Sequence, residues 1–334
     1  MSVAEDLLSA KVTSIEEVGG GRNSRVHRLL VGPSCTYALK SYFQHASDKR
    51  QRLKTEFYSL RFLRENGIRN VPQPVAASTE HKVAIYEWVN GQRIACDAID
   101  STAISAAASF LAELQTLRSQ PGSRSFQAAS EACFSGQTLV ENVSDRLQPL
   151  LARQDHDDLQ VFLSRDLAPA FARIIGWSRE RAGESFYIEL PEDRRILSPS
   201  DFGFHNALCC EKGQICFLDF EYFGWDDPAK TVSDFLLHPA MPLAHHRKQQ
   251  FARAVLEAFS FDPNLAERLQ AYYPLYGLKW CLILLNEFLP DQLLRRQFAT
   301  ANYQSAVKEN EQLTKAKAML HRIVSEYEHF PYLD

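Results

Sequence analysis

The strand-forming and helix-forming parts of the chain are separate, and the change from one to the other falls near residue 98. The first ninety residues contain β-branched and aromatic runs interrupted by turn residues, a pattern typical of strands. Further on, Ala- and Leu-rich stretches at 101–117 and 138–183 predict helices. We therefore expect an α+β fold, in which residues 1–89 form a small lobe around an antiparallel sheet and residues 90–334 form a larger, mostly helical lobe.

Four strands and one helix are expected in the first lobe. Residues 15–31 predict two strands joined by the turn GGGRNS, and TYALKSYF at 36–43 predicts a third. Residues 48–66 have the periodicity of an amphipathic helix that ends at Asn66-Gly67. The run VPQPVA then predicts an extended crossing, because residues before proline avoid the helical region. HKVAIYEWV predicts the fourth strand.

Composition excludes several classes of protein. With 45% hydrophobic and 23% charged residues among 334, the chain can bury a core and is not disordered. A net charge of −4 gives no basic field for nucleic acid or an anionic membrane, and no apolar run approaches the ~18 residues of a membrane span. The seven cysteines form no C-x-x-C pair, and the acidic start MSVAEDLLSAK does not have the pattern of a secretory signal. We expect a cytoplasmic protein without nucleic-acid or membrane partners.

The segment most informative for function is ILSPSDFGFHNALCCEKGQICFLDFEYFGWDDP, residues 196–228. Asp201 and Asn206 form a D-x-x-x-x-N pattern, and ALCC and ICFL predict a hairpin that brings Asn206 and Asp219 to the same end. Such oxygen ligands suit Mg²⁺ bound to a phosphate, and a remaining carboxylate can take a hydroxyl proton. Alternatively, D-x-x-x-x-N is a loop with an Asx turn, and Asp219 only caps a backbone turn.

The first lobe supplies a second set of candidates. Lys40 lies in the middle of the strand TYALKSYF, and Glu56 falls on the apolar stripe of helix 48–66. A charge on a buried face needs a partner, and Lys40 is the natural one. The alternative is that Glu56 lies at the edge of the stripe and is solvated. The turn containing Gly19, Gly20 and Gly21 can direct backbone N–H groups at phosphates, although hairpin turns also use glycine for conformational reasons alone.

The order of these features matches the parts of kinase-type phosphoryl transfer. No G-K-S/T follows the glycines, so the turn is not a Walker-type loop. The chain resembles the aminoglycoside phosphotransferase and choline kinase-like family, which has the bilobal protein-kinase-like fold. The resemblance covers nearly the whole chain, and it is carried by GGGRNSRVHRL, TEFYSLRFLRENGIRNVPQPVA, SDFGFHNAL and FLDFEYFGWDDPAKTVSDF.

The resemblance implies a small-molecule kinase that uses Mg²⁺. It would move the γ-phosphate of ATP or GTP to a hydroxyl of an amino sugar, a sugar or an amino alcohol. Asp201 would be the catalytic base, and Asn206 and Asp219 would hold Mg²⁺. Lys40, paired with Glu56, would hold the α- and β-phosphates.

The resemblance also implies where the nucleotide binds. Gly20, Gly21 and Ser24 in the glycine-rich turn would contact its phosphates, and main-chain groups near Glu87 and Val89 would contact adenine. The first lobe would then be the nucleotide-binding lobe, and the second would carry the catalytic and metal loops of segment 196–228 and the acceptor site.

One position departs from the family pattern. The family usually has His-Gly before the catalytic aspartate, and here Pro199 stands in the place of the histidine. Pro199 leaves open a second class of function, a catalytically silent nucleotide-binding regulatory protein. The presence together of five polar residues argues against this class; they are Lys40, Glu56, Asp201, Asn206 and Asp219. A protein kinase is disfavoured because no A-P-E follows Asp219. The resemblance gives Asp234 the role of bracing the catalytic loop.

The acceptor is constrained only by charge. From residue 241 to the end, 11 Lys and Arg residues stand against 10 Asp and Glu residues. A pocket for a polycationic aminoglycoside would need a surplus of acid, and this part of the sequence has none.

Overall fold

A computed structural model describes residues 2–18, 24–43, 50–290, 292, 298 and 305–333. The chain forms two compact units. The first comprises the chain up to Ile94 together with Phe204–Phe223 and Phe298, and the second comprises Ala95–Gly203, Gly224–Gln292 and residues 305–333. The first unit carries an antiparallel sheet and the second is mostly helical, which confirms the expected fold class.

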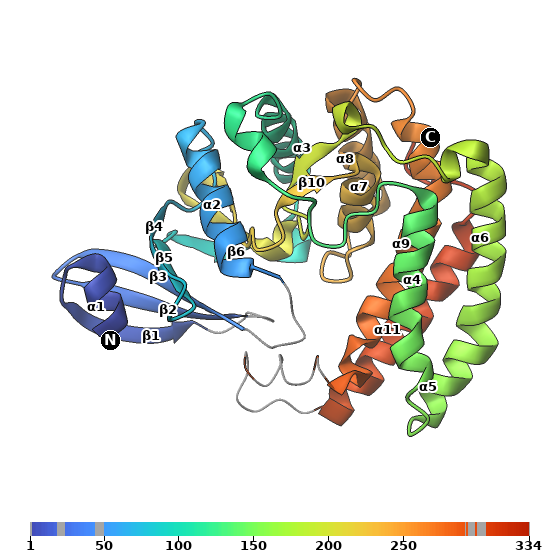
Figure 1. Ribbon diagram of the computed structural model, residues 1–334, viewed down its shortest axis with the longest axis horizontal. Helices are drawn as coiled ribbons and strands as arrows, with labels where there is room; N and C mark the ends of the chain where they lie inside the picture. The colour runs from blue at the N-terminus through green and yellow to red at the C-terminus, as the bar shows by residue number, and fades with distance from the viewer. Residues whose placement is uncertain are drawn as a thin grey trace. The chain divides into compact units, whose positions relative to one another are not determined.

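The first unit is built on a five-stranded antiparallel sheet in the order β1-β2-β3-β5-β4 (Figure 1). The strands are β1 (Val12–Val18), β2 (Ser24–Val31), β3 (Cys35–Tyr42), β4 (Pro74–Ser78) and β5 (Val83–Glu87). A short helix that the sequence analysis does not anticipate, α1 (Ser2–Leu8), places Ala4 in a core with Leu29 and Ile85. The turn predicted between the first two strands is GGGRNS at 19–24; residues 19–23 lie outside the described part of the chain, and Ser24 begins β2.

Helix α2 (Arg52–Glu65) corresponds to the helix predicted at 48–66, and it begins a few residues later than predicted. Leu53, Leu60 and Leu63 lie buried along one face, as their spacing requires. The helix ends at the predicted place. The Asn66 side chain donates a hydrogen bond to the Phe62 carbonyl (2.8 Å), and the next residue, a glycine, has the left-handed φ of 91° typical of a helix end.

A second sheet of the first unit has the order β6-β8-β9 and consists of β6 (Gly91–Arg93), β8 (Ala207–Cys210) and β9 (Ile215–Phe217). The β8–β9 hairpin is the one predicted from ALCC and ICFL. The observed units do not divide the chain at a single boundary between residues 89 and 90. Because β6 pairs with β8, and Phe217 N donates to the Asn70 carbonyl at 2.9 Å, Phe204–Phe223 belongs with the N-terminal unit.

The second unit consists mainly of helices (Figure 1). They are α3 (Ser101–Thr116), α4 (Gly136–Leu151), α5 (Asp157–Val161), α6 (Ala168–Ala182), α7 (Pro228–Leu237), α8 (His245–Ala258), α9 (Leu265–Leu284) and α11 (Ser305–Glu326). Helix α9 is central, because it packs against α4, α6, α7 and α11. Strands β7 (Ile196–Ser198) and β10 (Gly224–Asp226) form an antiparallel ribbon. Within the described part of the chain, no helix has the length and apolar character needed to cross a membrane.

Candidate active site

Lys40 pairs with Glu56, as the sequence predicts. Strand β3 is hydrogen-bonded to β2 and β5, so Lys40 lies opposite Val26 on one side and Ala84 on the other. Its Nζ atom is 2.6 Å from Oε2 of Glu56, and both side chains are buried. The alternative, in which Glu56 is solvated at the edge of its helix stripe, is therefore excluded.

Tyr42, which no sequence motif singled out, holds Glu56, and Tyr86 contacts Tyr42 in turn. The Tyr42 hydroxyl donates to Glu56 Oε2 (2.7 Å) and lies 2.7 Å from the hydroxyl of Tyr86. The backbone N–H of Phe220 points at the other carboxylate oxygen, 3.4 Å away. Tyr42 lies two residues after Lys40, so the strand period places both on one face, and this signal could have identified it. With both oxygens engaged, Glu56 holds the lysine and is not presented to a ligand.

Asp219 is the second close partner of Lys40. Its Oδ1 atom is 2.7 Å from Nζ, and 34% of its side chain is exposed. Its φ of 67° is in the left-handed region, which is costly for a residue other than glycine and recurs at functional sites. The backbone N–H of Leu218 donates to the Asn206 carbonyl (2.8 Å), so Asn206 and Asp219 leave the β8–β9 hairpin at the same end, as predicted.

Glu221 adds a third carboxylate beside Lys40, and Arg52 accompanies it. Glu221 Oε2 is 3.6 Å from the lysine Nζ, and its Oε1 is 3.3 Å from Arg52 Nε. Burial, reinforced by the charge of Asp219, raises the pKa of Glu221 to about 7. Burial alone would lower the pKa of Lys40, but the carboxylates around it raise that pKa well above its ordinary value, so the lysine is a cation at neutral pH.

The carboxylates of Glu56, Asp219 and Glu221 could hold a metal ion, because one oxygen of each lies within 4.8 Å of the others. Oxygen donors of this kind are the ligands that Mg²⁺ prefers. Glu56 is engaged by Lys40 and a tyrosine, and Glu221 by Arg52, whereas Asp219 remains partly exposed. The residues therefore fit a magnesium ion held chiefly by Asp219.

Asp201 belongs to the second unit and lies in the loop after β7. The preceding residue, Ser200, has a left-handed φ of 68°. The following residue, Phe202, stacks on Phe110 of α3 and on Phe235 of α7, with ring centroids 5.7 and 5.8 Å apart. The backbone is thus fixed on both sides of Asp201, while its carboxylate stays partly exposed.

Lys230 of α7 supports this loop, a contact that no sequence motif indicates. Its buried Nζ donates to Ser200 Oγ (2.9 Å) and to Asp226 Oδ2 (2.8 Å), and it lies 3.3 Å from Asp234 Oδ2. Lys230 makes the direct contact with the loop, and Asp234 pairs with Lys230. The Ser200 hydroxyl therefore ties the loop before Asp201 to α7.

The residues proposed to contact the nucleotide phosphates are only partly described. Gly20 and Gly21 lie outside the described residues. Ser24 begins β2, is buried, and pairs with Tyr42 across the β2–β3 ladder. Its contact with a phosphate stays a prediction.

The residues proposed to contact adenine follow β5. The N–H of Glu87 donates to the Gln73 carbonyl (2.8 Å), and the Glu87 carboxylate accepts from the Gln73 N–H (3.1 Å). Val89 lies just beyond the strand and is half-buried. A ligand cannot use the Glu87 N–H while these bonds stand, and the adenine contact stays a prediction.

The fold is that of protein-kinase-like phosphotransferases, a small antiparallel sheet followed by a helical unit. The chain belongs to the phosphotransferase enzyme family, whose sequence profile matches residues 14–272. No curated protein is similar enough in sequence to count as a match.

Several solved structures share this fold. They include the spectinomycin phosphotransferase APH(9)-Ia in complex with ADP and spectinomycin, with 13% identity over 96% of each chain and a TM-score of 0.66. The choline kinase LicA from Streptococcus pneumoniae has 13% identity over 96% of this chain and 98% of its own, with a TM-score of 0.61. The complex of gentamicin with APH(2″)-IIa has 17% identity over 98% and 97%, with a TM-score of 0.62. At these identities the likeness is one of fold.

Proposed function

We propose that this protein transfers the γ-phosphate of ATP or GTP to a hydroxyl of a small molecule, with Mg²⁺ as cofactor. The observation that carries the proposal is the position of Lys40, buried between Glu56 at 2.6 Å and Asp219 at 2.7 Å. Burying such charges is costly, and the result is a fixed cation beside a partly exposed carboxylate, which suits a nucleotide phosphate and its metal. Membership of the phosphotransferase family supports the same reaction.

Each residue has one role in the proposed reaction. Lys40 contacts the α- and β-phosphates, and Glu56 orients the lysine. Asp219 and Asn206 would hold Mg²⁺, which offsets the charge of the phosphate oxygens when bound. Asp201 accepts the proton of the acceptor hydroxyl while the new oxygen–phosphorus bond forms and the bond from the γ-phosphorus to the bridging oxygen breaks.

The remaining contacts with the nucleotide are part of the same proposal. Gly20, Gly21 and Ser24 would contact the phosphates. Because the N–H of Glu87 is already donated within the sheet, the groups proposed for adenine are the Glu87 carbonyl and the backbone of Val89.

All seven cysteines are free thiols, which supports the proposed cytoplasmic location.

The acceptor class is an amino sugar, a sugar or an amino alcohol. The near balance of 11 basic and 10 acidic residues beyond residue 240 argues against a polycationic aminoglycoside. A catalytically silent regulatory role is the alternative that Pro199 suggested, but the loop before Asp201 is supported through Ser200 and Lys230 instead.

A screen of nucleotide consumption tests the proposal. The protein is incubated with ATP or GTP, Mg²⁺ and a panel of amino sugars, sugars and amino alcohols. We expect acceptor-dependent consumption that is lost in Lys40→Met and kept in Lys54→Met, a control that makes the same change at an exposed position of α2. Absence of acceptor-dependent consumption, together with absence of Mg-nucleotide binding, would contradict the proposed function.

A further inference from the structure

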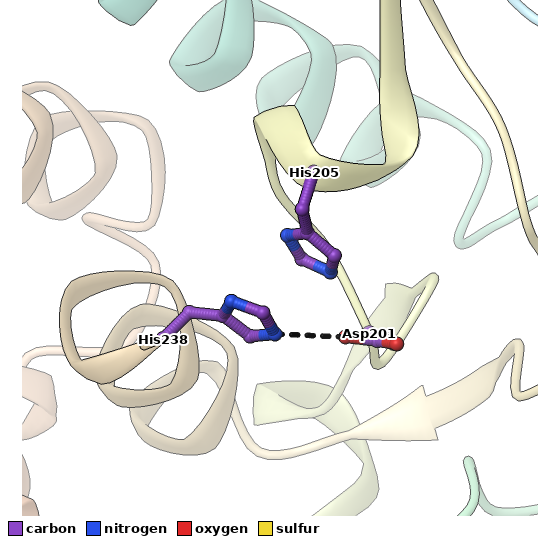
Figure 2. Close-up of side chains that lie close together, drawn as sticks. All are labelled: Asp201, His205 and His238. Atoms are coloured by element: carbon purple, nitrogen blue, oxygen red, sulfur yellow. Dashed lines mark ion pairs between the residues drawn. The ribbon is translucent and has the colours of Figure 1, made fainter. Parts of the chain in front are cut away.

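Helix α7 ends at Leu237, and the next residue, His238, reaches the proposed catalytic base. Its Nε2 atom lies 3.6 Å from Asp201 Oδ1 (Figure 2). The histidine side chain is 11% exposed and the aspartate side chain 37% exposed. One carboxylate oxygen therefore faces a largely covered imidazole, while the carboxylate as a whole remains accessible.

The surroundings of His238 fix both its ring and its proton. The backbone N–H of Ala240 donates to Nδ1 at 3.2 Å. An N–H group can only donate, so Nδ1 must present a lone pair, and the neutral ring then carries its proton on Nε2, the nitrogen that faces Asp201. The ring packs edge-on against Trp280 (centroids 4.7 Å apart, 79° between planes), and the Trp280 indole N–H donates to Asp234 at 2.8 Å.

We propose that His238 is a positioning residue for Asp201, a role that rests on the proposed phosphotransferase function. Its Nε2–H holds Oδ1 of the carboxylate in place, and Oδ2 accepts the proton of the acceptor hydroxyl. The distance of 3.6 Å is a few tenths of an ångström longer than a hydrogen bond, and such contacts tighten when the substrate is bound. The proton stops on Asp201, because taking it up at Nδ1 of His238 would set two donors, Nδ1–H and the Ala240 N–H, against each other.

Two substitutions separate the donated hydrogen bond from the packing of the ring. His238→Phe keeps an aromatic ring against Trp280 and removes the donor. His238→Gln loses the ring and can place an amide N–H near the position of Nε2. His245→Phe is the matched control, because His245 also packs against an aromatic ring, that of Tyr332 at 5.2 Å.

With an acceptor from the screen, we expect His238→Phe to lower kcat by about 10- to 100-fold, the cost of a misplaced reacting group. The dissociation constant of Mg-nucleotide and the KM for the acceptor should stay within about two-fold, because His238 acts only through Asp201. His238→Gln should recover most of kcat, and His245→Phe should behave as wild type. A normal kcat in His238→Phe, or a glutamine variant no better than the phenylalanine variant, overturns the inference.

A second measurement tests the position of the His238 proton without an acceptor, so its result is separate from the outcome of the screen that tests the proposed function. Nitrogen-15 NMR of the histidine rings, with the His238 signals assigned by their loss in His238→Phe, reports which nitrogen carries the proton. We expect the Nε2–H form in the whole protein near neutral pH. An Nδ1–H form would overturn the inference, because its donor would face away from Asp201.

Discussion

Replacing Lys230 by methionine tests how the loop before Asp201 is supported. The side chains of Lys230 and Asp226 are 2% and 0% exposed, and their charged atoms lie 2.8 Å apart. Methionine nearly matches lysine in length, so the main effect is a buried carboxylate that loses its cation. Removing one member of a buried ion pair costs about 3–5 kcal/mol, and we expect the free energy of unfolding to fall by this amount. Turnover should fall as well, because the Ser200 hydroxyl loses its contact.

The loss of stability in Lys230→Met should be larger at high pH than at low pH. Burial raises the pKa of Asp226 to about 6 with Lys230 present, and loss of the cation raises it further. When an acid has a higher pKa in the folded than in the unfolded protein, it contributes stability that is fully present below its unfolded pKa. This contribution is lost as the pH rises through its folded pKa. The stability difference between wild type and Lys230→Met should therefore be larger at about pH 8 than at about pH 5.

Urea unfolding, followed by circular dichroism at both pH values, measures the free energy of unfolding of wild type and Lys230→Met. Lys308→Met is the matched control. Lys308 pairs with Glu311 at 2.7 Å, but both side chains are 47% exposed. Removing an exposed pair costs about 0–1 kcal/mol. Equal losses at the two lysines, or a loss at Lys230 that does not change with pH, would refute the argument that Lys230 neutralises a buried acid.

Substitutions at Lys40, Glu56 and Gly224 give three further predictions. Lys40→Ala should weaken binding of a non-hydrolysable ATP analogue by about 1.5–3 kcal/mol, the worth of a charge-assisted contact, and unchanged affinity in a calorimetric titration would reject the phosphate site. Glu56→Ala should lose transfer activity, and adding Lys40→Ala should cost little more, since the glutamate acts through the lysine; additive losses in the double-mutant cycle would show that the two are not coupled. Gly224→Ala should destabilise the fold by about 1–3 kcal/mol, because its Cβ would clash with the Gln127 carbonyl oxygen, whereas Gly176→Ala in α6 meets open space. Equal melting temperatures for the two variants would contradict this prediction.

Features that depend on local periodicity could be predicted from the sequence. The apolar stripe of α2 placed Glu56 on the buried face, and the charge there required a partner, which is Lys40 at 2.6 Å. The apolar runs on either side of residues 211–214 predicted the β8–β9 hairpin, and this brought Asn206 and Asp219 to one end. The spacing of residues along the helix decides which side chains are buried, and the length of the hairpin decides which residues meet at its end. Both are local properties, so the sequence pattern predicts them.

Contacts between distant segments left no such pattern. Lys230 and Ser200 are 30 residues apart, and the loop before Asp201 gave no sign that a lysine of α7 supports it. The bracing role expected of Asp234 is indirect, because Asp234 pairs with Lys230 and accepts from the Trp280 indole. The pairing of β6 with β8 is equally non-local, and it moved Phe204–Phe223 into the first unit. Which distant polar groups meet is decided by the packing of the helices and strands, not by the local sequence.

The central claim is that Asp219 serves the metal and nucleotide while Asp201 serves the acceptor hydroxyl, and two isosteric substitutions test it most directly. Nucleotide affinity in Mg²⁺ and turnover are measured for Asp219→Asn and Asp201→Asn. We predict that Asp219→Asn loses metal-dependent nucleotide binding and transfer together. Asp201→Asn should bind Mg-nucleotide nearly as wild type while turnover falls roughly 10²–10⁴-fold, the usual worth of a positioned general base. Normal turnover in Asp201→Asn would contradict the account.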